Sequence, residues 1–402
     1  MTGALPALAG VVQQPFMRPD GTICTTPGYD PATRLYGSFG APNGSRAEDP
    51  TRDDAEAALA RLDALLEEFH FVDAVDRAAA LSAMLTAAVR PGLPTAPMFV
   101  VRAHVPGSGK SYLCELISAI ASPRRAAPLA FPGSDDECEK VLLAQFRRGS
   151  AVIEFDNVTR DLQPYKTLCT ALTSERISGR VRWASRIIEL STRSLMLANG
   201  NNVDPVGDLA RRCITVRLDV LTERPAERSF NEPNLLEVVR QHRGEYVAAA
   251  LTVVRAWLVA GMPKTECPEQ GSFNRWSDWC RHPLLWLGKP DPVGSMRVAH
   301  QEDPGRVLLG RLLTILHGRA GSGPVMARDL VGWAADEHPG ADDEQSLGEI
   351  LDEIAGDRGG AINRRRLGRW LKAQTGHIVG GLRLQRYPRR MNAETWHVVA
   401  AV

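Results

Sequence analysis

The amino-acid sequence predicts an α/β fold built on a parallel sheet, with a helical N-terminal extension and a distinct C-terminal unit. Short apolar segments alternate with helical ones between residues 98 and 218, and a glycine-rich loop joins the first of these segments to a helix. From residue 305 the pattern changes to helices followed by a hairpin. The length of 402 residues is enough for roughly two or three domains.

Composition narrows the class of protein. The chain has 48 Lys+Arg against 47 Asp+Glu, which excludes a uniformly basic coat for a polyanion but permits a local basic surface. Its seven cysteines include no CxxC pair, which favours a reducing compartment and no structural zinc. There is no apolar run of about 18 residues, so we expect no membrane contact and a cytoplasmic location.

The N-terminal extension covers residues 1–95. Its first 50 residues are rich in Gly and Pro and predict loops with short hairpins. Leucines at helical spacing predict a helix over 55–69, after Asp53 and Asp54, and a second helix is expected over 73–90, before Pro91.

The remaining elements follow in three segments. In the core, residues 96–225, we expect strands at 98–103, 151–155, 194–198 and 213–218, with a helix at 112–121. A helical region rich in Trp covers 226–304. In the C-terminal unit, residues 305–402, we expect helices at 306–318, 325–337, 344–356 and 363–374, then a hairpin at 376–401.

The strongest functional motif is the loop after the first core strand. Such a loop turns backbone N–H groups toward a phosphate, and the helix that follows adds its dipole. Lys110 would reach the β- and γ-phosphates, and Ser111 would ligate Mg²⁺. His104 stands where the GxxxxGK[ST] pattern has its first glycine. The residues predicted to hold ATP are Pro106, Gly107, Ser108, Gly109, Lys110, Ser111 and Tyr112.

An acidic residue ends the second core strand. Asp156 is predicted to hold the Mg²⁺ bound at Ser111, since the carboxyl ends of parallel strands meet at one edge. Asn157 follows, where many ATPases have a glutamate that polarises water. Glu154 shares a strand face with Asp156 and is a candidate base, although a plain strand-face acid is the stronger interpretation.

Polar residues also follow the third core strand. Asn201 is predicted to sense the γ-phosphate, with an Asn-rich turn as the alternative. Before the fourth strand stand Arg211 and Arg212, which are either a solvated face or the source of an arginine for a neighbouring subunit's nucleotide. We favour Arg212 for that role and place Arg211 second.

Two basic segments predict contacts with nucleic acid. The first is an expected hairpin with four arginines and a tryptophan, and the second runs from residue 358 to 390 with ten Lys+Arg and no acid. Helices followed by a β-ribbon describe a winged helix. A solvated basic face remains the alternative for both segments. The candidate DNA-binding residues are Arg176, Arg180, Arg182, Trp183 and Arg186 in the first segment, and Arg364, Arg365, Arg366, Arg369, Lys372, Arg383 and Arg386 in the second.

In this order the motifs resemble the helicase part of phage- and plasmid-type primase-helicase proteins, which belong to helicase superfamily three of the AAA+ class. The resemblance runs from about residue 20 to the C-terminus. It is carried by Pro27-Gly-Tyr-Asp30, Pro106-Gly-Ser-Gly-Lys-Ser111, Phe155-Asp-Asn157, Gly200-Asn-Asn202, Asp208-Leu-Ala-Arg-Arg212, Trp286-Leu-Gly288, Asp291-Pro-Val293 and Leu367-Gly-Arg-Trp-Leu371.

The resemblance implies an AAA+ P-loop core with a helical lid and a C-terminal winged helix. It further implies a homo-hexameric ring that hydrolyses ATP between subunits and moves DNA through its centre. The hairpin at 176–186 would line that channel, and a separate primase or initiator would act with the ring to replicate a mobile element. Two other functions stay open: a nucleotide-gated DNA-binding initiator or regulator, and a scaffold that has lost hydrolysis.

Overall fold

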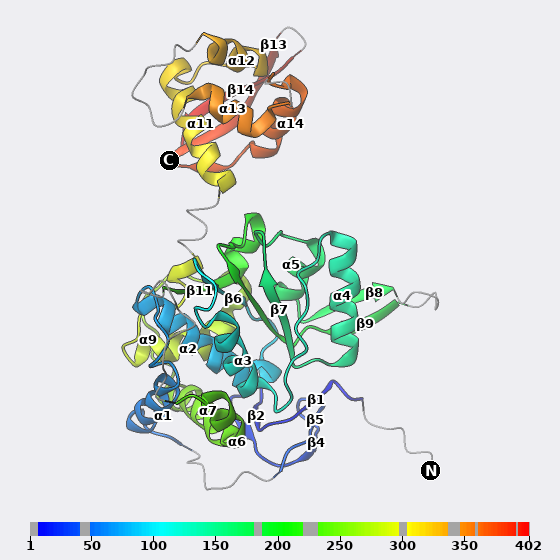
Figure 1. Cartoon of the computed structure of the whole chain (residues 1–402), viewed down its shortest axis with the longest axis vertical. Coiled ribbons are helices and arrows are strands. Elements are labelled where there is room, and N and C mark those ends of the chain that lie inside the picture. Colours follow the sequence, from blue (N-terminus) through cyan, green and yellow to red (C-terminus); the bar gives the residue numbers. More distant parts are fainter. Residues whose placement is uncertain are drawn as a thin grey trace. The chain divides into compact units, whose positions relative to one another are not determined.

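The computed structural model describes residues 7–40, 49–180, 187–219, 232–296, 304–336, 346–357, 361–390 and 393–401. The chain divides into two compact units, Met1–His300 and Gln301–Val402 (Figure 1). No helix among the described residues is both long and apolar enough to cross a membrane.

A four-stranded parallel sheet forms the centre of the first unit. Its strands stand in the order β11-β6-β10-β7, and every neighbouring pair is parallel. All four predicted strands are confirmed, but two of them continue beyond their expected ends, to Val158 and Asn201. The strands are β6 (Met98–Ala103), β7 (Val152–Val158), β10 (Leu195–Asn201) and β11 (Cys213–Leu218).

Helices cover both faces of this sheet. Phe99 and Val101 of β6 pack with α2 (Ala74–Val89) and α3 (Lys110–Ala121), whereas the alternating Met98 and Val100 pack with α4 (Asp135–Arg148) and α5 (Lys166–Thr173). Figure 1 shows α2 and α3 on one side of the strands and α4 on the other. The sequence analysis predicted α2 and α3, with α3 starting two residues earlier than expected, but it missed α4 and α5.

The N-terminal extension shares its core with the sheet. The first helix, α1 (Arg52–Ala64), starts earlier than predicted because Thr51 caps it through a reciprocal pair of hydrogen bonds with Asp54, and it also ends earlier, at Ala64. The expected short strands are present as β1 (Gly10–Val12), β2 (Phe16–Met17), β3 (Ile23–Cys24), β4 (Gly28–Asp30) and β5 (Leu35–Gly37).

An ion-pair cluster fastens α2 to the edge of the sheet. Asp73 caps the helix with its Oδ1, and its Oδ2 accepts a hydrogen bond from Arg217 of β11 at 2.8 Å. Asp76 is fully buried and accepts from both the backbone N–H of Arg217 (2.8 Å) and its guanidinium (3.1 Å). The extension is therefore bound to the last strand by charge as well as by apolar packing.

The Trp-rich region after residue 232 is helical, as predicted. Its helices are α6 (Leu235–Gln241), α7 (Arg243–Val259), α8 (Asn274–Trp276) and α9 (His282–Trp286), with a π-helix at Ser277–Arg281. Trp257, Trp276 and Trp279 are fully buried, so they belong to the core of the first unit. The indole of Trp276 donates to Thr86 Oγ1 of α2 at 2.8 Å.

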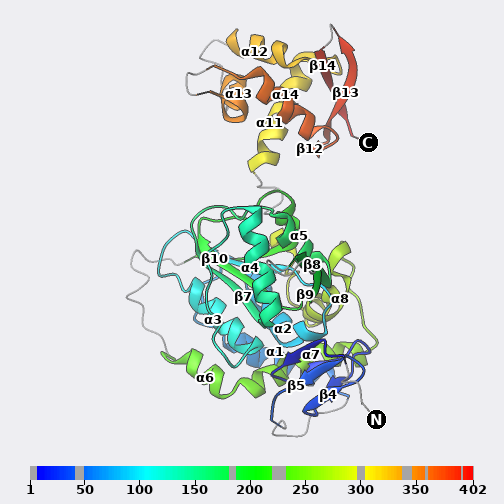
Figure 2. The same ribbon diagram turned by 90° about the vertical axis from the view of Figure 1, so that its right-hand side faces the viewer.

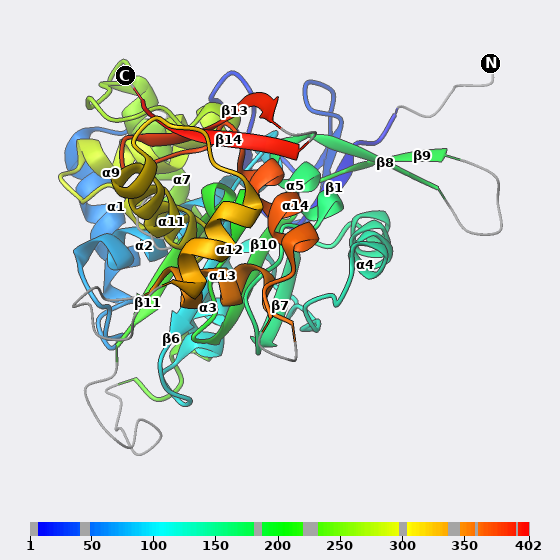
Figure 3. The same cartoon turned by 90° about the horizontal axis from the view of Figure 1, so that it is seen from above.

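A separate two-stranded hairpin projects from the first unit, as Figure 3 shows. The predicted hairpin is formed by β8 (Arg176–Arg180) and β9 (Ile187–Ser191), which pair antiparallel from Arg176–Ser191 to Arg180–Ile187. Gly179 lies against Leu143 of α4, where a Cβ atom would come within 2.4 Å of that side chain. The predicted contacts Arg182, Trp183 and Arg186 lie outside the described residues.

The second unit has its own core. Its helices and strands match the predicted series, and Leu367 and Leu371 are buried while Trp370 packs half-buried against them. The elements are α11 (Pro304–Ala320), α12 (Ala327–Ala335), α13 (Leu347–Ala355), α14 (Arg364–Gln374), and an antiparallel sheet of β12 (Ile378–Val379), β13 (Leu382–Arg390) and β14 (Ala393–Ala400) (Figure 2).

Candidate functional site

The glycine-rich loop joins β6 to α3, as the sequence predicts. Gly107 and Gly109 have φ of 75° and 90°, a backbone conformation that only glycine adopts easily. Gly109 stands at the N-cap of α3, and no side chain among the described residues caps that helix. The first N–H groups of α3 are therefore available to a phosphate.

Lys110 is held inside the loop. Its Nζ donates to the carbonyl oxygen of Val105 at 3.0 Å and to Ser108 Oγ at 2.9 Å. The side chain is buried, and burial lowers the pKa of its ammonium group. A phosphate bound at the loop would replace these neutral oxygens with charged ones.

Ser111 meets the acid of the second strand. Ser111 Oγ lies 3.0 Å from Asp156 Oδ1 although the two residues are 45 positions apart. A hydroxyl and a carboxylate oxygen are the ligand types that Mg²⁺ prefers, usually with water and phosphate oxygens completing the shell. The described residues contain no group of three or more His, Cys, Asp or Glu side chains that could hold a metal by themselves. The donor set therefore fits a magnesium ion that arrives with a nucleotide.

Asn199 is a functional candidate that the sequence analysis missed. Its Oδ1 lies 3.3 Å from Ser111 Oγ and accepts from the backbone N–H of Asn157 at 3.2 Å. Only 1% of the residue is exposed, and its Nδ2 has no hydrogen-bond partner among the described residues. The buried Cys114 thiol, a weak acceptor, lies beside this amide, and a ligand oxygen would be a stronger partner for it.

The contacts of Asn199 bear on the predicted role of Asn201. Asn201 pairs in register with Ala103 of β6 and makes no hydrogen bond to Ser111 or Asp156 within the described structure. The prediction placed the end of this strand at residue 198, whereas β10 runs on to Asn201, so both asparagines belong to the strand. Asn199 is therefore the amide that contacts Ser111, while the Oδ1 of Asn201 is buried and also has no partner among the described residues, so the role of Asn201 stays a prediction.

Glu154 lies away from the predicted magnesium site. It faces α3, as Asp156 does, but its neighbour there is Ser118, whose Oγ donates at 3.4 Å. Ser118 follows Ser111 by seven residues, which is about 10 Å along a helix. Burial, and then the nearby Asp156, raise the pKa of Glu154 to about 7. The distance argues against Glu154 as a direct base and supports the interpretation of a strand-face acid.

Asn157 has a backbone reason to be asparagine. Its φ is 52°, in the left-handed region that asparagine adopts more readily than glutamate does. Its side chain is exposed. Asparagine therefore stands where many ATPases have glutamate, at a residue with left-handed backbone conformation next to Asp156.

The two arginines before β11 differ in exposure and in hydrogen-bond partners. The side chain of Arg212 is 12% exposed and donates to Thr173 Oγ1 (2.8 Å), the Cys169 carbonyl (3.1 Å) and Asp208 (2.6 Å). The side chain of Arg211 is 59% exposed and pairs only with Asp208 among the described residues. Arg212 fastens the 3-10 helix Gly207–Arg212 to α5, so Arg211 is the arginine that another molecule can reach.

His104 and Tyr112 brace the loop. His104 Nδ1 lies 2.8 Å from Asn202 Oδ1, which connects the start of the loop to the end of β10. The hydroxyl oxygen of Tyr112 accepts from the backbone N–H of Leu236 at 3.0 Å, and its ring lies 6.2 Å from that of Phe69. The missing first glycine of the loop is thus replaced by a residue with a structural contact.

The predicted DNA-binding residues of the second unit lie mostly on its surface. Leu367 and Leu371 fix the inner face of α14. Arg366 is exposed and donates to the Gly356 carbonyl at 3.2 Å, and Arg383 is half-buried. The other exposed cations are Arg364, Arg365, Arg369 and Lys372 on α14 and Arg386 on β13.

In the hairpin of the first unit, the described candidate side chain is Arg176. It is 53% exposed and pairs with Glu189 of β9 at 3.2 Å. The strand that carries it ends at Arg180.

Comparison with known proteins identifies no family. No family model matches the chain, and no curated protein matches it. A solved structure that does match is the A-form apo structure of the NrS-1 C-terminal region, with 12% sequence identity and a TM-score of 0.41 over 93% of this chain and 84% of that chain. The assignment of the site therefore rests on the geometry of the site itself.

Proposed function

We propose that this protein is an ATPase that moves along DNA during the replication of a mobile element. The observation that carries the proposal is the meeting of Ser111, Asp156 and Asn199 directly behind the glycine-rich loop, with oxygen–oxygen distances of 3.0 and 3.3 Å. Three separate segments of sequence supply these residues, and a chance GSGKS loop would not gather them.

Each residue has a distinct task in this proposal. The loop and the first turn of α3 bind the phosphates, and Lys110 moves from Val105 and Ser108 to the β- and γ-phosphate oxygens. Ser111 and Asp156 would hold Mg²⁺, which neutralises phosphate charge when it is bound. The Nδ2 of Asn199 would donate to a γ-phosphate oxygen or to the attacking water.

The larger assembly belongs to the same proposal. Arg211 would reach the nucleotide of a neighbouring subunit in a homo-hexameric ring, and the hairpin β8–β9 would contact single-stranded DNA in its centre. The second unit would bind duplex or forked DNA as a winged helix, through the exposed face of α14 and through β13. A separate primase or initiator would act with the ring.

The test is ATP turnover by the full chain, with and without single-stranded DNA, at two salt concentrations. We expect turnover that DNA stimulates, stimulation that weakens as salt rises, and loss of both in Lys110→Ala. Turnover that Lys110→Ala leaves intact would refute the assigned loop.

One observation favours a second function, a nucleotide-gated DNA-binding switch. Asn157 cannot accept a proton, and Glu154 bonds to Ser118, which is about two helical turns after Ser111. Nucleotide binding without turnover, combined with DNA affinity that the nucleotide changes, would support the switch over the motor.

A further inference from the structure

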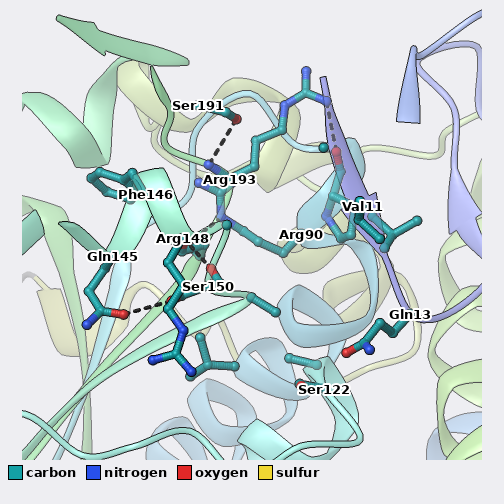
Figure 4. A pocket seen from close by; sticks show the side chains of 18 of the residues that line it. Val11, Gln13, Arg90, Ser122, Gln145, Phe146, Arg148, Ser150, Ser191 and Arg193 are labelled. Atoms are coloured by element: carbon teal, nitrogen blue, oxygen red, sulfur yellow. Dashed lines mark hydrogen bonds between the residues drawn. The ribbon is translucent and has the colours of Figure 1, made fainter. Parts of the chain in front are cut away.

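A cleft of about 560 Å³ lies at the amino end of the central sheet, opposite the edge that carries Ser111 and Asp156. Figure 4 shows Val11 of β1 on one side and Gln145, Phe146 and Arg148 of α4 on the other. Ser150 and Ser194, which precede β7 and β10, also line the cleft, as does the base of the hairpin β8–β9. The candidate nucleotide site contributes no residue to it.

The cleft carries an excess of positive charge. Six of the lining residues are arginines, and one lining residue among those described, Glu189, is acidic. Arg125 pairs with Glu115, Arg176 with Glu189, and Arg193 with Glu175. The other three arginines have no carboxylate partner within the described structure: Arg90, Arg124 and Arg148.

Arg90 brings a buried charge to the floor of the cleft. It is 3% exposed and donates to the carbonyl oxygens of Ser194 (3.0 Å), Leu93 (2.7 Å) and Thr192 (2.6 Å). Burial, and then the neighbouring Arg193, lower the pKa of this guanidinium to about 9. The carboxylate near Arg90, Glu175, already pairs with Arg193, so an anion in the cleft would further offset the cost of this buried charge.

Arg148 and Arg124 place exposed guanidinium groups on different elements around the cleft. Arg148 ends α4, and Arg124 follows α3. Interaction with the dipole of α4 accounts for a cation at its C-terminus, but it accounts equally for Arg147, which does not line the cleft. The dipole of α4 therefore does not by itself explain why Arg148 lines the cleft.

The lining favours phosphates over bases. Phe146 is the one aromatic residue among the described lining residues, and at 6% exposed it packs in the core instead of offering a stacking surface. Serine hydroxyls and glutamine amides supply neutral hydrogen-bonding groups around the arginines, and Ser150 and Gln145 bond each other at 2.7 Å. Binding at this cleft would depend on the charge and spacing of the phosphates and would show no preference for base sequence.

We propose that this cleft binds the phosphodiester backbone of single-stranded nucleic acid. Its cations are spread over several elements of an open surface, and one wall is the base of a hairpin whose sequence continues with further arginines. An extended chain of phosphates fits that distribution better than a single compact anion does. Binding at the cleft needs no nucleotide at the opposite edge of the sheet, so it stands or falls independently of ATP turnover.

The test uses the full chain and a fluorescently labelled oligothymidylate, with anisotropy measured over a series of salt concentrations. The variants are Arg148→Glu and Arg124→Glu/Arg148→Glu, and the matched control is Arg147→Glu, which makes the same charge change one residue away on the same helix. We expect the double variant to bind the oligonucleotide about tenfold more weakly. The slope of log binding constant against log salt concentration should become shallower by about 0.7 for each phosphate contact removed. The control should keep wild-type affinity and slope.

A local readout separates this cleft from other basic surfaces of the chain. The oligonucleotide should slow backbone hydrogen exchange in residues 8–14 of the wild-type protein and leave it unchanged in the double variant. Equal affinity, slope and exchange in the double variant and in the Arg147→Glu control would overturn the proposal.

A free polyphosphate shares the chemistry and is distinguished by a separate arm. If inorganic tripolyphosphate binds the wild type, Arg148→Glu abolishes that binding, and oligonucleotide affinity is unaffected by the variant, then the cleft is a polyphosphate site and the nucleic-acid proposal is wrong. Thermal unfolding of each variant checks that these exposed substitutions leave the fold intact.

Discussion

The two edges of the central sheet differ in how their polar groups are held. At the carboxyl edge, Ser111, Asp156 and Asn199 are short side chains that bond one another. At the amino edge, Arg124 and Arg148 are long side chains without a carboxylate partner among the described residues. The first arrangement fixes atoms in advance, which suits catalysis and metal binding. The second supplies charge without fixed geometry, which suits a ligand bound for its phosphates.

The largest effects should separate the two edges completely. Lys110→Ala removes a charge-assisted contact of about 2–3 kcal/mol and should weaken nucleotide binding by roughly 100-fold, with oligothymidylate affinity unchanged. The double variant Arg124→Glu/Arg148→Glu should weaken oligothymidylate binding and leave nucleotide affinity unchanged. Titration calorimetry with a non-hydrolysable ATP analogue and the anisotropy assay measure the two affinities. If either variant lowers both affinities, the two edges do not act independently.

Two asparagine variants test which amide at the carboxyl edge of the sheet acts in ATP turnover. Asn199→Ala should lower ATP turnover by about 100-fold because it removes a preorganised donor, while Asn201→Ala should change turnover by less than about threefold. Steady-state phosphate release measures both. The opposite order of the two effects would restore the assignment made from the sequence.

The raised pKa of Glu154 predicts that the stability of the protein depends on pH. The pKa of Glu154 is about 7 in the folded protein against a usual 4.5, so the wild type loses stability as pH rises through this interval and keeps the deficit above it. Glu154→Gln cannot ionise and should gain about 3 kcal/mol over the wild type at pH 8, and almost nothing at pH 4. Urea unfolding at both pH values measures the difference. If the difference in free energy of unfolding between Glu154→Gln and the wild type were the same at both pH values, the folded protein would not raise the pKa of Glu154.

The smallest effect concerns the left-handed turn at Asn157. Asn157→Gly should leave the free energy of unfolding within about 0.5 kcal/mol of wild type, whereas Asn157→Val should lose about 1–2 kcal/mol because β-branched residues resist positive φ. Urea unfolding of both variants provides the comparison. Equal losses would show that the side chain, and not the backbone, decides the residue at this position.

The carboxyl edge could be predicted because its residues follow strand ends directly in the sequence. Lys110, Ser111 and Asp156 each stand within or next to a recognisable apolar strand or glycine-rich loop. The predicted strands were correct in position, but two of them were too short at their ends, and the contacts of Asn199 inside β10 were not foreseen. A strand that ends in Asn-Gly-Asn reads as a turn from composition alone.

The difference in exposure between Arg211 and Arg212 could not be predicted from the sequence, for a different reason. It depends on Thr173 and Cys169, about 40 residues earlier, on a helix that was not predicted. The arginine cleft is a stronger case, because its lining comes from residues 8 to 194 and no short motif marks it. Sites built from distant segments leave no local pattern to read.

The ion-pair cluster between α2 and β11 has a practical consequence for dividing the protein into fragments. A cut at residue 95, where the sequence suggests that the P-loop segment starts, would strip Arg217 of Asp73 and Asp76 and uncover the apolar face on which α2 lies. Breaking a buried pair in this way costs about 3–5 kcal/mol before the lost apolar contact is added. A shortened protein meant for solution work should therefore keep α1 and α2, and a protease should find few open sites between residue 76 and the end of β6, where the backbone is largely buried.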